Sequence, residues 1–117
     1  MTTESILLEN VAEYYSNAIA AKSKGQFNTA VTLLFKTASA LCDLFIYRNH
    51  GRIPSSHADR LRILENKYEA VYSMLDRDFS FYQDSYTKRL TKEVSEILED
   101  DVRKISNIVG INLQEIR

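Results

Sequence analysis

The stretch FNTAVTLLFKTASALCDLF, residues 27–45, decides the fold class of this chain. Its apolar residues recur at helical spacing, but they surround the helix instead of forming one stripe. A helix that is apolar on nearly all sides has to be covered by other elements of a fold. We therefore expect a central, buried helix that begins at Phe27 and ends where Asn49 and Gly51 interrupt the pattern.

Two further apolar stripes lie on either side of this central helix and predict two more helices. The first helix covers roughly residues 4–24 and ends at Gly25. The third follows Pro54, with Ser55 or Ser56 as its cap. The stripes consist of Leu7, Val11, Tyr14, Ala18 and Ala21 in the first helix, and of Leu61, Leu64, Tyr68, Val71 and Leu75 in the third.

The C-terminal part adds one more helix and one open question. Residues 76–88 fit either a helix extension or a loop. A last helix begins at Thr91, which can cap it, and ends at Gly110; residues 111–117 then fray or dock. Its stripe consists of Leu90, Val94, Ile97, Leu98, Val102, Ile105 and Ile108. Because short connections favour antiparallel neighbours, we predict an all-α, antiparallel up-down bundle of four or five helices, a single domain over residues 1–117.

Composition limits the class of protein. The chain has 44% hydrophobic and 26% charged residues, and its formal net charge of -1 excludes a globally basic nucleic-acid binder. Cys42 is the single cysteine, so no intrachain disulfide can form. The N-terminus has no basic segment followed by an apolar one, and no apolar run approaches the roughly 20 residues that cross a bilayer. We expect a cytoplasmic protein without a membrane segment.

Ordered features between roughly Tyr14 and Ile108 resemble the HEPN family. They are Ala21-x-x-Lys24-Gly25-Gln26-Phe27-x-x-Ala30-Val31-x-Leu33-Leu34-Phe35, Ala38-x-Ala40-Leu41, Ser56-His57, Tyr82, Tyr86 and Arg89-Leu90-Thr91. The resemblance implies a small antiparallel helical bundle, often a homodimer, usually paired with a minimal nucleotidyltransferase in prokaryotic two-gene, toxin–antitoxin-like systems. Tetratricopeptide modules share the Gly-x-Phe-x-x-Ala turn, but one copy appears here and stacked repeats need at least three.

Some HEPN proteins are metal-independent RNases with an Arg-polar-x(3 to 5)-His signature, and the resemblance makes Arg52 and His57 the catalytic candidates. Histidine would act as the acid or base at the ribose 2'-hydroxyl, while arginine would stabilise charge on the phosphate. The chain departs from this signature because Ile53 replaces the polar residue, Asp59 replaces a tyrosine, and the pair precedes the third helix. The simpler alternatives are a packed histidine and an ion-paired arginine, and we expect little RNase activity.

Other side chains suggest binding surfaces. A nucleic-acid or phosphate patch would use Arg48, Arg60, Arg62, Lys88 and Arg89. The alternative for Arg60 and Arg62 is a surface ion pair with Asp59 or Glu65 at helical spacing. A dimer or partner interface is the role we expect for Phe79, Phe81, Tyr82 and Tyr86, since no single helical face can bury all four rings, and the alternative is internal packing.

No metal or cofactor site is expected. The acidic residues of the last helix lack any Glu-x-x-His pairing and predict a solvated face: Glu93, Glu96, Asp100 and Asp101. Cys42 lies in an apolar run and is expected to be a structural thiol. The functional prediction is therefore a HEPN-like subunit that binds a partner, with RNA or a nucleotide as a further candidate ligand. The alternatives are a peptide-binding helical-hairpin adaptor and a metal-independent RNase.

Overall fold

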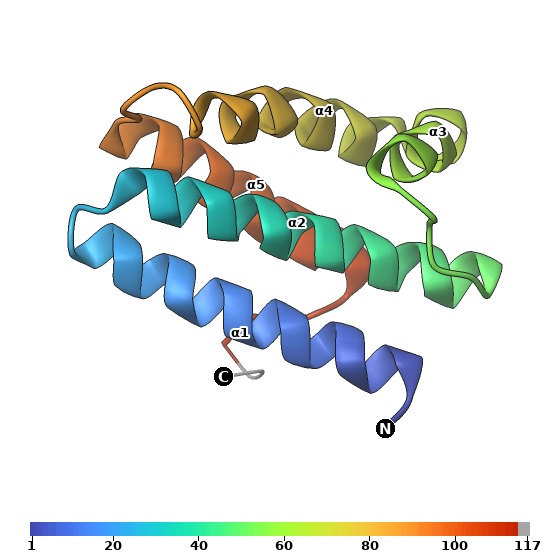
Figure 1. Cartoon of the computed structure of the whole chain (residues 1–117). Coiled ribbons are helices and arrows are strands. Elements are labelled where there is room, and N and C mark those ends of the chain that lie inside the picture. Colours follow the sequence, from blue (N-terminus) through green and yellow to red (C-terminus); the bar gives the residue numbers. More distant parts are fainter. Residues whose placement is uncertain (115–117) are drawn as a thin grey trace.

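Five α-helices and no strands make up residues 1–114, the part of the chain that the computed structural model describes (Figure 1). The helices are α1 (Thr3–Ser23), α2 (Phe27–His50), α3 (His57–Lys67), α4 (Glu69–Asp84) and α5 (Lys92–Val109). Helices α1 and α4 run antiparallel to α2, whereas α5 runs parallel to it (Figure 1). The prediction of an all-helical bundle is confirmed.

Helix α2 lies at the centre of the bundle, as its apolar composition predicts. It packs against all four other helices, and Leu34, Leu41 and Leu44 along it are fully buried. The left-handed backbone of Gly51 (φ 74°) ends the helix, and its N–H donates to the carbonyl of Tyr47. The core therefore forms around one helix that has almost no exposed side.

The expectation that no apolar segment approaches a membrane span needs correction. Within residues 1–114, α2 is the one helix that contains an 18-residue stretch apolar enough to cross a bilayer. Of that stretch, 61% is buried inside the bundle. This burial is typical of the core helix of a globular fold.

Two apolar stripes differ from the prediction. In α1 the buried tyrosine is Tyr15, at 6% exposure, and Tyr14 is half-buried. In α5 Ile97 and Ile108 face solvent, because the buried side of that helix also carries polar residues such as Asp101. In both helices, the buried face is shifted by one position along the chain relative to the predicted stripe.

The third predicted helix is in fact two helices. The backbone leaves helical geometry at Tyr68 (φ -141°, ψ 62°), where α3 ends and α4 begins, although no glycine or proline marks the site. The Tyr68 ring packs edge-on against Phe45 of α2, with ring centroids 4.6 Å apart. Tertiary packing therefore holds the break. The open question about residues 76–88 is also answered, because α4 continues to Asp84.

The α4–α5 loop is tied to α2 mainly by the side chain of Asn28, and the Thr32 hydroxyl also lies 3.4 Å from that of Ser85. The amide nitrogen of Asn28 donates to the carbonyls of Ser85 (3.0 Å) and Lys88 (2.7 Å). Its amide oxygen accepts from the N–H of Leu90 at 2.8 Å. Thr91 then caps α5 by accepting from the N–H of Val94. These bonds set where α5 begins.

The described part of the segment after α5, residues 110–114, packs against the core. Gly110 adopts a left-handed backbone (φ 83°) that ends the helix, and Leu113 is buried at 6% exposure against the core. Residues 115–117 of the expected frayed or docked tail lie outside the described part.

Candidate functional site

Arg60, on α3, makes three polar contacts with the side chains of Asp43 and His57. Its Nε donates to Oδ1 of Asp43 at 2.6 Å, and its Nη2 donates to Oδ2 at 2.9 Å. Its Nη1 lies 3.1 Å from Nδ1 of His57. Both members of the ion pair are mostly buried, at 15% and 13% side-chain exposure. This two-bond fork fixes α3 against α2 and aligns the histidine.

His57 stands at the start of α3, where Ser56 caps the helix by accepting from the N–H of Asp59. Its ring centroid lies 4.2 Å from that of Phe79 and 5.6 Å from that of Phe35. Burial is the main reason why the pKa of His57 lies below its ordinary value, and the nearby positive charge of Arg60 lowers it further. Because Nδ1 accepts from Arg60, the neutral ring carries its proton on Nε2, which is buried without a partner among residues 1–114.

Arg52 has a different partner. Its Nη1 donates to Oδ2 of Asp59 at 2.8 Å, and the same carboxylate accepts from the N–H of Ser55 at 2.9 Å. These two bonds hold the pKa of Asp59 well below its usual range. The structure thus joins Arg52 to Asp59 and His57 to Arg60. Catalysis by Arg52 and His57 stays a prediction, and both side chains already have structural contacts.

The five expected phosphate-binding cations lie apart. Arg48, near the end of α2, bonds Glu4 of α1 at 2.9 Å, and Arg62 of α3 lies 3.6 Å from Asp59. Lys88 and Arg89 belong to the α4–α5 loop at the opposite end of the bundle (Figure 1). Lys88 pairs with Asp84 at 3.3 Å, whereas no ion pair of Arg89 is present within residues 1–114. Because Lys88 and Arg89 lie at the opposite end of the bundle from Arg60, the five cations do not form one continuous patch.

Three of the four rings expected at an interface form a series with Phe35 from the core to the surface, and no ring contact of Phe81 is present within residues 1–114. Phe35 of α2 is buried, and Tyr82 of α4 stacks on it with centroids 4.8 Å apart. Tyr86 follows at 5.6 Å from Tyr82, and the two hydroxyls lie 2.9 Å apart. Tyr86 is 74% exposed, while Phe79 and Phe81 are half-buried. We call Phe79, Phe81, Tyr82 and Tyr86 the α4 aromatic surface.

A small polar cavity of about 200 Å³ lies between α1, α2 and α3. Lys36, Ser39 and Asp43 of α2 line it, together with Arg60. The remaining lining residues come from α1 and α2: Leu7, Asn10, Tyr14 and Ala40. The Ser39 hydroxyl is buried and has no hydrogen-bond partner within the described chain. The Lys36 ammonium lies 5.9 Å from the ring centroid of Tyr14. Cationic and hydroxyl donors therefore converge on this cavity.

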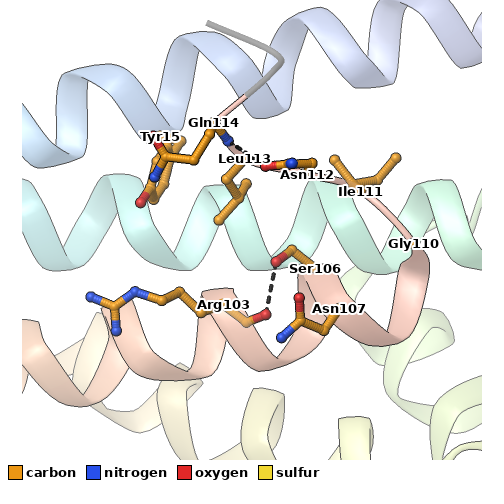
Figure 2. Close-up of a pocket in the computed structure, with 9 residues that line it drawn as sticks. All are labelled: Tyr15, Arg103, Ser106, Asn107, Gly110, Ile111, Asn112, Leu113 and Gln114. Carbon is orange, nitrogen blue, oxygen red and sulfur yellow. Dashed lines mark hydrogen bonds between the residues drawn. The ribbon is translucent and has the colours of Figure 1, made fainter.

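Figure 2 shows a larger hollow, of about 450 Å³, between α1, the end of α5 and the segment that follows it. Its polar groups serve the fold: the Ser106 hydroxyl donates to the Arg103 carbonyl at 2.7 Å, and Asn112 accepts from the Gln114 N–H at 2.9 Å. The Arg103 guanidinium points out of the cluster (Figure 2) and bonds Glu99 at 2.6 Å. The smaller cavity contains a buried hydroxyl without a hydrogen-bond partner, that of Ser39, whereas no buried polar side-chain atom of this hollow is without one in the described chain.

A buried acid pair joins α4 and α5. Asp78 and Asp101 are 1% and 2% exposed, and Arg77 bonds Asp101. Burial, reinforced by hydrogen bonding to Asp101, raises the pKa of Asp78 to about 8. Asp101 is thus not part of a solvated face, which corrects the prediction for that residue. A signal for Asp78 was present, since it continues the apolar stripe of α4 at helical spacing after Val71 and Leu75.

Sequence reasoning missed the side chains of the small cavity on α2. Asp43 interrupts the apolar run of α2, and a charge at such a position is a signal, because a buried charge is costly unless it is paired. Cys42, as expected, is a buried thiol, and burial raises its pKa to about 12. Within residues 1–114 no cluster of three or more His, Cys, Asp or Glu side chains could hold a metal ion.

Comparison of this chain with protein-family models, curated proteins and solved structures finds no match. The structure shows an all-helical fold of five helices over residues 1–114, and membership of the HEPN family stays a prediction from the sequence.

Proposed function

We propose that this chain is a HEPN-like helical subunit that binds a protein partner through the α4 aromatic surface. The observation that carries the proposal is Tyr86, which is 74% exposed at the end of a stack of rings. Aromatic residues are enriched in the cores of protein interfaces, where they bury large areas at low entropic cost. A tyrosine held in place yet left in water fits a surface that another protein covers.

The anchoring of these rings supports binding over accidental exposure. Tyr82 stacks on the buried Phe35, and its hydroxyl pairs with that of Tyr86. The rings are therefore ordered before a partner arrives, which lowers the entropy lost on association. The basic residues Lys88 and Arg89 follow Tyr86 after one intervening residue, and only Asp84 opposes them among the nearby ion pairs. This charge favours a partner with an acidic contact surface.

The HEPN resemblance supplies the candidate partner. We propose a minimal nucleotidyltransferase encoded beside this chain in a prokaryotic, toxin–antitoxin-like pair, with the helical subunit forming a homodimer in the cytoplasm. A binding role is favoured over catalysis because Arg52 bonds Asp59, and His57 packs against both Phe35 and Phe79. An RNase role would require both side chains to leave these contacts.

Co-expression of the chain with the neighbouring nucleotidyltransferase tests this proposal. We expect a stable complex in size-exclusion chromatography with light scattering, and at least about a tenfold loss of affinity for Tyr86→Ala, as for an interface hot spot. The matched control is Ile108→Ala, since Ile108 is also an exposed apolar residue but lies on α5. No complex with the wild type, or equal affinity for both variants, overturns the proposal.

A further inference from the structure

We propose that the small cavity between α1, α2 and α3 binds a phosphate group, free or as a monoester, through Arg60, Lys36 and Ser39. This site goes beyond the proposed partner surface and does not depend on it. The α4 aromatic surface uses other side chains, so either proposal can fail while the other stands.

Arg60 keeps donors available for a ligand. A guanidinium has five N–H groups. Two of them bond Asp43 and a third points at Nδ1 of His57, which leaves one N–H on each terminal nitrogen. Because Asp43 and His57 fix the plane of the group, the two remaining donors have fixed directions, and Arg60 is one of the residues that line the cavity. Arginine held in this way is suited to a tetrahedral oxyanion.

Lys36 and Ser39 supply the opposite wall. No carboxylate within residues 1–114 lies within ion-pair distance of the Lys36 ammonium. Ser39 lies three residues after Lys36 on α2, which is nearly one helical turn. Its hydroxyl is buried and has no hydrogen-bond partner in the described chain. A buried hydroxyl without a partner costs free energy, and a ligand oxygen would remove that cost. In the proposed complex, both groups donate to the same anion.

Charge and size narrow the ligand. Lys36 and Arg60 contribute two positive charges against one negative charge from Asp43, so the lining is cationic. Its volume of about 200 Å³ lies below the roughly 300–1,000 Å³ of sites for drug-sized molecules. A phosphate group fits inside, while the organic part of a monoester would extend out of the cavity.

The test is an amide chemical-shift titration of the full-length protein with inorganic phosphate, adenosine monophosphate and acetate. We expect saturable shifts at Ser39 and at the Arg60 Nε–H, and Lys36→Met should weaken binding roughly 10- to 100-fold, the usual effect of losing a charge-assisted hydrogen bond. Lys104→Met is the control, since Lys104 is an exposed lysine of α5 that pairs with Asp100. Lys36 is exposed as well, so both variants should fold.

The arms of the titration separate the possible ligands. Tighter binding of adenosine monophosphate than of inorganic phosphate assigns the site to a monoester, and equal binding assigns it to free phosphate. Equal response to acetate overturns the choice of phosphate. Absent shifts at Ser39 and Arg60, or equal affinities for Lys36→Met and Lys104→Met, overturn the site itself.

Discussion

Arg60 of α3 holds Asp43 of α2 through two hydrogen bonds, 2.6 and 2.9 Å long, and this pair connects the features that matter for function. The same guanidinium orients His57, whose ring supports Phe79 of the α4 aromatic surface. It also lines the small cavity beside Lys36. The short helix α3 therefore positions both proposed binding sites while contributing little to the central core.

The central position of α2 makes Leu34 a sensitive core position. Leu34 is fully buried, and replacement of a buried leucine by alanine removes apolar contacts and leaves a cavity. We expect Leu34→Ala to lower the free energy of unfolding by about 2 to 5 kcal/mol in chemical denaturation. Leu33→Ala is the neighbouring control at a half-buried position and should cost less. A loss much below 1 kcal/mol for Leu34→Ala would contradict the central placement.

Asn28 should control the order of the α4–α5 loop. Asn28→Ala removes all three hydrogen bonds to Ser85, Lys88 and Leu90, and we expect a loss of about 1–3 kcal/mol together with faster amide exchange at Leu90. Asn49→Ala is the control, because Asn49 is exposed and bonds only the Phe45 carbonyl in its own helix. Unchanged exchange at Leu90 would show that the loop is held by other contacts.

Asp78 should make the protein less stable as pH rises. Its pKa is raised from 3.8 to about 8 in the folded state by burial, so the folded protein keeps a proton that the unfolded chain releases above pH 3.8. The stabilising effect of that proton is complete below pH 3.8 and declines up to pH 8, by as much as about 1.4 kcal/mol per pH unit.

Asp78→Asn tests this dependence, since the amide has the same shape and cannot ionise. We expect the variant to be more stable than the wild type at pH 7 and to lose less stability between pH 5 and 8 in denaturant titrations. Asp76→Asn, at an exposed position two residues earlier on α4, should leave the wild-type slope. Identical slopes for Asp78→Asn and the wild type would mean that Asp78 is ionised in the fold.

RNase activity should be absent or weak. A general acid–base residue contributes about 10²- to 10⁴-fold in rate, and His57 is held by Arg60 and Phe79 instead of facing a cleft. In a cleavage assay with chelator, we expect wild type, His57→Ala and Arg52→Ala to give the same background. Cleavage that both variants abolish, while Arg89→Ala retains it, would establish the enzyme.

Much of the fold could be predicted because α2 dominates it. The apolar stretch from Phe27 and the glycines at positions 51 and 110 give clear helix boundaries. The break at Tyr68 could not be predicted, since it depends on packing against Phe45 and has no local sequence marker. Tyr14 and Tyr15 both fit helical spacing with Val11 and Ala18, so periodicity alone could not decide which is buried.

The site was harder to predict than the fold. The sequence spacing suggested that Arg52 and His57 act together. In the structure Arg52 bonds Asp59 and His57 contacts Arg60, because the carboxylate that each arginine reaches is decided only when the chain folds. Asp43 lies 17 positions before Arg60 on another helix, so no local pattern indicates their contact. The exposure of Tyr86 fits the expectation that one helical face cannot bury all four rings, and their role as an interface stays a prediction.

Amide hydrogen exchange on the complex with the co-expressed nucleotidyltransferase tests the partner-binding role most directly. We expect residues 79–88, the end of α4 and the start of the following loop, to gain protection on binding, while α1 keeps the exchange rates of the isolated chain. Tyr86→Ala should remove this protection. A complex that protects α1 and leaves residues 79–88 unchanged would contradict binding through the α4 aromatic surface.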